Sequence, residues 1–272
     1  MNSATNTPSL QPYRPRFFAD LRRFGNRFDG GYVIPRFVIE ASDVLLSLGV
    51  EADWSFEEAI HAAKPSLQIT CVDGTTGPEA IELKIRRDLL RAVKQLRPRK
   101  FIRVIRAWRK PAQFLEFFSR HEFLPLMVTP TTCAGGITLA ELLAHVRAGN
   151  TSRWVFVKMD IEGSEYDVLR ASADVLDRIS GFVIEFHDLS SNWTRFQDSM
   201  AMLDRAFYIA HVHGNNNDDC IPQTRVPMTL EITFVNKALS PVAPLPSDAV
   251  YPVAGLDYPN RPRRPDLSLR FD

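Results

Sequence analysis

Short apolar runs alternate with amphipathic segments along most of the chain. Seven runs have the composition of buried β-strands: Val44–Leu48, Leu67–Val72, Phe101–Ile105, Trp154–Val157, Phe182–Phe186, Phe207–Val212 and Leu230–Val235. Between most of them lie segments with the apolar spacing of helices: Phe56–Ala63, Glu79–Leu96, Ala112–Phe118, Leu139–Val146, Tyr166–Ala171 and Arg195–Leu203. Because strands that alternate with helices are joined by right-handed crossovers, this pattern predicts a parallel sheet covered on both faces.

The last two predicted strands, Phe207–Val212 and Leu230–Val235, have no helix between them. The loop Gly214–Pro227 joins them instead, and such a connection favours an antiparallel pair at the edge of the sheet. The expected fold class is therefore α/β: a doubly wound, Rossmann-like, seven-stranded sheet in a single domain. We expect this sheet to be mostly parallel with an antiparallel edge strand.

The two ends of the chain differ from this alternating core. Residues 1–15 are polar and lack periodicity, which predicts a flexible N-terminal tail before a domain that spans residues 16–240. Residues 241–272 are Pro-rich and predict an extended C-terminal segment packed on the domain. The N-terminus lacks the apolar segment of a signal peptide, and no stretch approaches the ~20 apolar residues of a membrane span. We therefore expect a cytoplasmic protein.

Composition and charge narrow the classes of partner. The 272 residues are 45% hydrophobic and 24% charged, which is typical of a soluble globular protein. The net charge of +1 gives no global basic field, so we expect no nucleic-acid partner. Basic residues are dense between Arg86 and Lys110, which we interpret as a solvated helix face. Cys71, Cys133 and Cys220 form no CxxC pair and indicate neither a zinc knuckle nor a disulfide framework.

Ligands of doubly wound sheets bind at the carboxyl ends of the strands, so the residues that follow each predicted strand are candidate site residues. The first strand is followed by Gly49, Glu51 and Ser55, with one glycine where dinucleotide sites use three. This disfavours a pyrophosphate and suits a ligand without phosphates, such as S-adenosylmethionine. The second strand is followed by Asp73 and Gly74, and an acidic residue here can accept hydrogen bonds from both ribose hydroxyls. The alternative is that both segments are ordinary turns.

Four charged side chains follow the fourth predicted strand, in the segment Lys158–Glu165. Charges after a buried run are costly unless they face a cleft or pair with one another. Asp160 stands at the strand end, within reach of a sulfonium or an acceptor hydroxyl. Lys158 is two residues earlier and shares its face of the strand. The alternative is that part of the segment, such as Glu165, forms a Lys–Glu salt bridge that caps the next helix.

The fifth and sixth predicted strands each end with histidine beside polar residues. Side chains two residues apart share a face, so Glu185 and His187, and likewise His211 and His213, are expected to point toward Asp160. Asp160, Glu185, His187 and His213 are candidate ligands of a divalent cation such as Mg²⁺ or Mn²⁺. Alternatively, His187 or His213 is a general base that takes the proton of a hydroxyl.

Several short segments of the chain, among them Lys158–Glu165, resemble those of the FkbM-type methyltransferases, a branch of the class I S-adenosylmethionine-dependent enzymes. The segment Lys158–Glu165 carries the most specific likeness. The other blocks follow in the expected order: Asp29–Tyr32, Ser47–Glu51, Trp54–Glu57, Gly136–Leu139, His211–Asn215 and Leu256–Asn260. The resemblance implies a class I fold in which the Gly49–Ser55 turn and Asp73 hold the cofactor and Asp160 lies at the reaction centre. Members usually methylate hydroxyls, often on sugars or natural products.

The expected function is therefore O-methyl transfer from S-adenosylmethionine to a hydroxyl of a sugar, glycan or natural product, with or without a metal. The catalytic candidates are Lys158, Asp160, His187 and His213. Two alternatives stay open. One is a metal-dependent hydrolase that uses the carboxylate and histidine cluster, and it would not need Asp73. The other is a non-catalytic module that binds adenosine or a glycan.

Overall fold

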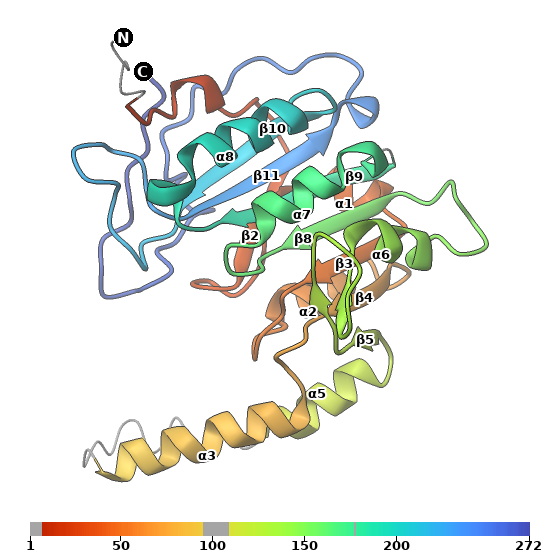
Figure 1. The fold of residues 1–272 in the computed structure, drawn as a ribbon. Helices are drawn as coiled ribbons and strands as arrows, with labels where there is room; N and C mark the ends of the chain where they lie inside the picture. Colours follow the sequence, from red (N-terminus) through yellow and green to blue (C-terminus); the bar gives the residue numbers. More distant parts are fainter. Residues whose placement is uncertain (1–6, 95–108, 177) are drawn as a thin grey trace.

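The computed structural model describes residues 7–94, 109–176 and 178–272 (Figure 1). Within these residues a mixed α/β fold is built on a seven-stranded sheet with the strand order β10-β11-β9-β8-β3-β4-β5. Its strands are β3 (Val44–Leu48), β4 (Gln68–Val72), β5 (Glu122–Leu124), β8 (Val155–Met159), β9 (Ile179–Phe186), β10 (Phe207–Gly214) and β11 (Leu230–Asn236). Six of the seven predicted strands correspond to members of this sheet. The remaining one, Phe101–Ile105, lies outside the described residues.

The sheet is mostly parallel, as expected, but its antiparallel strand is not at the edge. β11 runs antiparallel to both of its neighbours, β9 and β10, so the edge strand β10 has the same direction as the parallel strands. The chain leaves β10 and returns to insert β11 between the two. All seven residues of β11 are buried. Both backbone edges of β11 are paired at this position, whereas an edge strand would leave one of them open.

Hydrophobic clusters lie on the two faces of the sheet, because successive strand residues point to opposite sides. Leu46 and Leu48 of β3 belong to one cluster, whereas Leu45 belongs to the other. The first cluster includes residues of α6 (Leu139–Val146), α7 (Glu165–Ala171) and α8 (Leu189–Leu203). The second includes residues of the hairpin β1 (Leu21–Gly25) and β2 (Gly31–Pro35), and of the helices α1 (Arg36–Ala41), α2 (Ser55–Ala63), α3 (Pro78–Lys94) and α5 (Lys110–Phe118).

Shorter elements complete the described part of the chain. Met127–Val128 (β6) and Gly136–Ile137 (β7) form a small parallel pair beside the main sheet. α6 starts with a capping box, in which the side chains of Thr138 and Glu141 bond to each other's backbone N–H. α3 extends away from the sheet together with α5 (Figure 1). No described helix is long and apolar enough to cross a membrane.

Both terminal segments that the structure describes pack on the sheet region. In the predicted tail, Leu10 is buried and Tyr13 packs its ring on Phe196 of α8 at a centroid distance of 5.2 Å. In the C-terminal segment, Tyr251 and Leu269 pair as a short antiparallel bridge, and both are buried. The predicted limits of the domain, residues 16–240, stay a prediction.

Candidate active site

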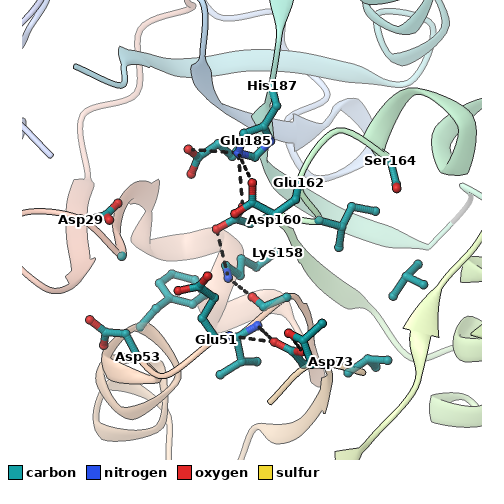
Figure 2. A pocket seen from close by; sticks show the side chains of 18 of the residues that line it. Asp29, Glu51, Asp53, Asp73, Lys158, Asp160, Glu162, Ser164, Glu185 and His187 are labelled. Carbon is teal, nitrogen blue, oxygen red and sulfur yellow. Dashed lines mark hydrogen bonds and ion pairs between the residues drawn. The ribbon is translucent and has the colours of Figure 1, made fainter. Parts of the chain in front are cut away.

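The carboxyl ends of β3, β4, β8 and β9 open into one cavity of about 430 Å³ (Figure 2). Eight of the residues singled out from the sequence line it: Gly49, Glu51, Asp73, Gly74, Lys158, Asp160, Glu185 and His187. The turn between β1 and β2 adds Asp29 and Gly30, and the loop after β10 adds Asn215, Asn217 and Asp218. The cavity thus lies where a ligand site of a parallel α/β sheet is expected.

Gly49 lets the turn after β3 approach the end of β8. Its φ is +77°, and a Cβ added here would lie 1.8 Å from the carbonyl oxygen of Asp160. Any other residue would push the two strand ends apart, so the glycine is required by a close backbone approach. Ser55, the other end of this turn, does not line the cavity. Its hydroxyl accepts a hydrogen bond from the N–H of Asn26 at 3.1 Å, and the helix starts without a side-chain cap.

Asp73 joins the turn after β3 to the loop after β4. One of its oxygens accepts hydrogen bonds from the N–H groups of Val50 and Glu51 at 3.0 and 2.8 Å. The other accepts from the N–H and hydroxyl of Thr75 and from the N–H of Thr76. Burial alone would raise the pKa of Asp73, but these hydrogen bonds lower it. The carboxylate therefore shapes the turn, and its contact with a ribose stays a prediction.

Lys158 lines the cavity, and its side chain is largely buried. Its Nζ donates to the carbonyl oxygen of Gly49 and lies 3.7 Å from Oδ2 of Asp160. Burial lowers the pKa of Lys158, but the carboxylates of Asp160, Glu57 and Glu185 raise it above its ordinary value. The ammonium therefore stays charged and ties the Gly49 turn to β8. It also lies beside two buried acids, Glu57 and Glu185. In this arrangement Lys158 positions Asp160.

Tyr32 of β2 is a site residue that the sequence analysis did not single out. Its hydroxyl donates to Oδ2 of Asp160 at 3.2 Å and lies 3.5 Å from Oε2 of Glu185. Burial, together with the charges of Asp160 and Glu185, raises the pKa of Tyr32 well above its ordinary value. The phenol is thus a neutral donor between two carboxylates. An isolated tyrosine in an apolar strand carries no sequence signal for this role, although Tyr32 is the last residue of the noted Asp29–Tyr32 block.

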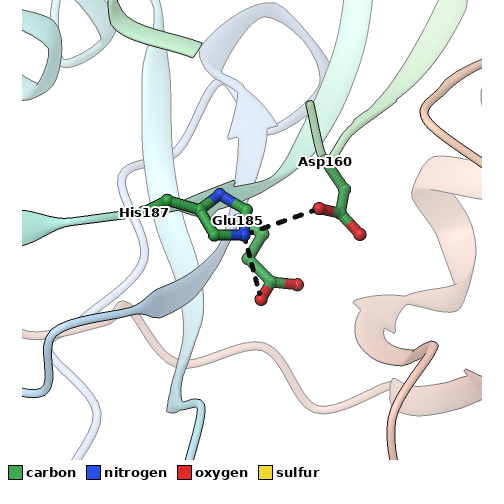
Figure 3. Close-up of side chains that lie close together, drawn as sticks. All are labelled: Asp160, Glu185 and His187. Atoms are coloured by element: carbon green, nitrogen blue, oxygen red, sulfur yellow. Dashed lines mark ion pairs between the residues drawn. The ribbon is translucent and has the colours of Figure 1, made fainter. Parts of the chain in front are cut away.

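Asp160, Glu185 and His187 converge in the cavity (Figure 3), and one ligand atom from each lies within 4.8 Å of the others. His187 Nε2 is 3.8 Å from Asp160 Oδ1 and 3.6 Å from Glu185 Oε1. In an octahedral site with bonds of about 2.1 Å, neighbouring ligands are about 3 Å apart and opposite ones about 4.2 Å. Behind the ring, Glu165 Oε1 contacts His187 Nδ1 at 3.0 Å. A carboxylate behind a histidine is a common support for a metal ligand, so these residues fit a divalent cation.

Without a bound cation, burial and neighbouring charges determine the protonation of Glu185 and His187. The pKa of Glu185 lies well above its ordinary value because the side chain is buried and faces Asp160 and Glu231. Burial lowers the pKa of His187, but Glu165, Glu185 and Asp160 raise it to about 10. His187 then carries a positive charge at neutral pH and is a donor. Its role as a general base stays a prediction.

His211 and His213 do not join this cluster, contrary to the expected convergence. His211 Nε2 contacts Oδ1 of Asp257 at 2.8 Å. His213 contacts Glu231 through Nδ1 at 3.1 Å and Asp266 through Nε2 at 3.0 Å. The reason is topological: β11 separates β10 from β9, so these histidines meet carboxylates of β11 and the C-terminal segment. Glu165, at the start of its helix, contacts His187 and accepts hydrogen bonds from the N–H groups of Ile161 and Gly163, so its partner is a histidine and not the lysine of the alternative interpretation.

Comparison with known proteins gives one family match. The model described as methyltransferase FkbM domain matches residues 136–210, which include Lys158, Asp160, Glu185 and His187. No curated protein sequence matches the chain.

Solved structures of low identity align with most of the chain. One is a putative DNA modification methyltransferase encoded within a prophage (E. coli), with 10% identity, a TM-score of 0.41 and coverage of 73% of this chain. The alignment spans 48% of that protein. Another is M. capricolum TrmK in complex with S-adenosyl-homocysteine, with 10% identity, a TM-score of 0.37 and coverage of 74% of this chain and 66% of that one. A third is the mitomycin 7-O-methyltransferase MmcR, with 11% identity, a TM-score of 0.33 and coverage of 74% and 52%.

The family match falls on the segment that carries the most specific sequence likeness. It covers the end of β8, where Asp160 faces the cavity, and all of β9. The match confirms the resemblance to the FkbM-type methyltransferases in this part of the chain.

Proposed function

We propose that this chain transfers the methyl group of S-adenosylmethionine to a hydroxyl of a sugar, glycan or natural product, with a divalent cation at Asp160, Glu185 and His187. One observation carries the proposal. The glycine turn after β3, closed by Asp73, opens into the same cavity as the carboxylate and histidine cluster. A nucleoside cofactor and a hydroxyl can therefore meet beside Asp160.

The cofactor belongs to the side of the cavity formed by β3 and β4. Gly49, Glu51, Asp73 and Gly74 line this side, and the single glycine turn suits a nucleoside without phosphates. The methyl-bearing sulfonium is a cation, and the carboxylate of Asp160 at the end of β8 favours it electrostatically. This orientation places the transferable methyl group toward β9.

The acceptor belongs to the other side, between Glu185, His187 and the loop after β10. Its hydroxyl oxygen attacks the methyl carbon, the carbon–sulfur bond breaks with its electron pair on sulfur, and the hydroxyl proton passes to the carboxylate of Asp160. Tyr32 and Lys158 hold Asp160 in place for this step, and Glu165 holds the ring of His187. A cation bound at the cluster would lower the pKa of the hydroxyl.

Calorimetry with S-adenosylmethionine and S-adenosyl-homocysteine, with and without Mg²⁺ or Mn²⁺, tests the proposal. We expect both nucleosides to bind in the micromolar range, and labelled methyl groups to appear on at least one member of a panel of glycosides and natural-product alcohols. If neither nucleoside binds in that range, the proposal is wrong. Binding without transfer to any acceptor would support the non-catalytic module. Ester or phosphoester cleavage without the nucleoside would support the hydrolase.

A further inference from the structure

The C-terminal segment Leu256–Asp266 contacts both segments that line the acceptor side of the cavity. If the cofactor occupies the β3 and β4 side, as the proposed function has it, the acceptor meets the turn Asn26–Gly30 and the loop Asn215–Asp218. These contribute Asp29, Gly30, Asn215, Asn217 and Asp218 to the lining, whereas no residue of 256–266 lines the cavity.

The contacts with the turn involve polar and stacking interactions. Asn260 Nδ2 donates to Oδ1 of Asp29 at 3.2 Å. The guanidinium groups of Arg23 and Arg27 lie 5.7 and 4.4 Å from the ring centroid of Tyr258. Arg23 also donates to two backbone carbonyls of the turn, those of residues 26 and 28. The turn is therefore held against the C-terminal segment.

The contacts with the loop are more numerous. Asn216 Nδ2 donates to the carbonyl oxygens of Arg261, Arg264 and Pro265 at 3.1–3.2 Å, and its Oδ1 accepts from the N–H of Arg261. Arg261 Nε donates to Oδ1 of Asn217 at 2.7 Å. Arg264 Nη1 donates to the carbonyl oxygens of Asn216 and Asn217. Loop and segment thus form one hydrogen-bonded unit.

Buried ion pairs fix this unit on the sheet. Asn260 Nδ2 also donates to Oε1 of Glu231 at 2.7 Å, and Oε2 of Glu231 contacts His213. Asp266 contacts the other nitrogen of His213. Asn260 is 6% exposed, so this amide is a fixed link between the sheet and Asp29. The Leu256–Asn260 block thereby gains a physical role near the cavity.

We propose that Leu256–Asp266 determines acceptor binding, with Asn260 and Arg261 as positioning residues. Asn260 acts through Asp29, and Arg261 acts through Asn217. Neither contacts the cofactor side, where Gly49 and Asp73 hold their own turn. The family model matches residues 136–210. Acceptor selection then depends on a part of the chain outside this match. A displacement of a cavity wall by about 1 Å is enough to cost about 10²-fold in rate.

The test compares two variants with two matched controls in the full-length chain. Asn260→Ala is paired with Asn236→Ala, another buried asparagine, whose amide donates to the carbonyl oxygen of Ile179. Arg261→Ala is paired with Arg263→Ala, an exposed arginine of the same segment.

Four quantities are measured for each protein: the Kd of S-adenosylmethionine, kcat and KM for the best acceptor in a panel of methyl glycosides and alcohols, and hydrogen exchange by mass spectrometry. We expect Asn260→Ala to raise the acceptor KM about 10-fold and Arg261→Ala about 3-fold, both with the cofactor Kd within about twofold of wild type. Exchange should accelerate at residues 26–30 in Asn260→Ala and at residues 215–219 in Arg261→Ala. The controls should change neither KM nor exchange at these two segments.

An unchanged acceptor KM in both variants overturns the inference, as does an equal change in the controls. If Asn260→Ala does not fold, the exposed Arg261 decides alone. A wild-type chain that binds no cofactor or methylates nothing in the panel refutes the proposed function instead. The positioning inference is then judged by hydrogen exchange, and unchanged exchange at residues 215–219 in Arg261→Ala overturns it.

Discussion

The ends of β9 and β10 each present a histidine among carboxylates, in two different settings. At the end of β9, His187 directs Nε2 into the cavity toward Asp160 and Glu185, with Glu165 behind the ring, and 16% of its side chain is exposed. On β10, His213 has a carboxylate on each nitrogen, Glu231 and Asp266, and 3% of its side chain is exposed.

This difference separates a residue that can act on a ligand from one that holds the fold. A ring nitrogen that faces a cavity is available to a metal, an acceptor or a proton. A ring with a carboxylate on each nitrogen has no nitrogen left for a metal or an acceptor. The surroundings of the two histidines differ because β11 lies between their strands. The order of the strands therefore decides the role of a histidine at a strand end.

The largest expected effect lies in the cavity cluster. Asp160→Asn keeps the shape of the side chain but removes its charge beside the proposed methyl group. We expect kcat/KM for methyl transfer to fall by about 10³-fold or more, with the circular dichroism spectrum and melting temperature close to wild type. Asp174→Asn, an exposed carboxylate outside the cavity lining, is the control and should keep full activity. Full activity of Asp160→Asn would remove Asp160 from the mechanism.

His213→Gln is expected to act on stability. Contacts with Glu231 and Asp266 raise the pKa of His213 to about 10, although burial acts to lower it, and the value in the unfolded chain is about 6.5. A raised folded-state pKa stabilises the protein fully below pH ~6.5, and this stabilisation is lost as pH rises toward 10. We expect the variant to lose about 3–5 kcal/mol of unfolding free energy at pH 6.

Urea denaturation at pH 6, 8 and 10 measures this difference. The gap between wild type and His213→Gln should be widest at pH 6 and narrow toward pH 10. The comparison isolates His213, because every other titrating group is shared by the two proteins. A gap that stays constant with pH would mean that the pKa of His213 is the same in the folded and the unfolded protein, and the contrast with His187 would then weaken.

Metal affinity sharpens the same contrast. In the proposed cation site, His187→Ala removes a ligand and should weaken Mn²⁺ binding by about 100-fold or more. Glu165→Gln removes the charge behind the ring and should weaken it by about 10–100-fold. His213→Gln should leave it unchanged. Calorimetric titration of Mn²⁺ alone gives the three affinities, and equal weakening by His213→Gln would contradict the separation of the two clusters.

Much of the cavity could be predicted because parallel strands end at one edge of a sheet. Gly49, Asp73 and Asp160 each follow an apolar run, and the crossover pattern is enough to bring such residues together. The position of β11 could not be predicted in this way. An apolar run reads alike at the edge and inside a sheet, and this ambiguity explains the mistaken expectation for His213.

Three further features had no local signal. β5 has three residues, all partly exposed, so its sequence shows no clear apolar run. The contact between Asn260 and Asp29 joins residues 231 positions apart in the chain. Hydrophobic periodicity reports local structure and burial, and it contains no information on which distant polar groups meet. Tyr32 escaped prediction for the same reason, because its partners come from β8 and β9.

On the cofactor side, Asp73→Asn should have a moderate effect. The amide retains one acceptor oxygen, so it cannot serve both the turn after β3 and the loop that contains Thr75. Hydrogen bonds to a charged acceptor contribute about 1.5–3 kcal/mol each. We expect the Kd of S-adenosylmethionine to rise about 10-fold, measured by calorimetry. An unchanged Kd would show that neither the turn nor the ribose depends on the Asp73 charge, which would favour the hydrolase alternative.

The smallest expected effect belongs to Ser55, which stands in the same predicted turn as Gly49 but does not line the cavity. Its hydroxyl accepts from the N–H of Asn26, so Ser55→Ala removes a hydrogen bond between α2 and the β1–β2 turn. We expect a loss of about 0.5–1.5 kcal/mol in unfolding free energy and a cofactor Kd within about twofold of wild type. The same calorimetric titration, run beside Asp73→Asn, checks both. A tenfold weaker Kd for Ser55→Ala would place Ser55 on the cofactor side after all.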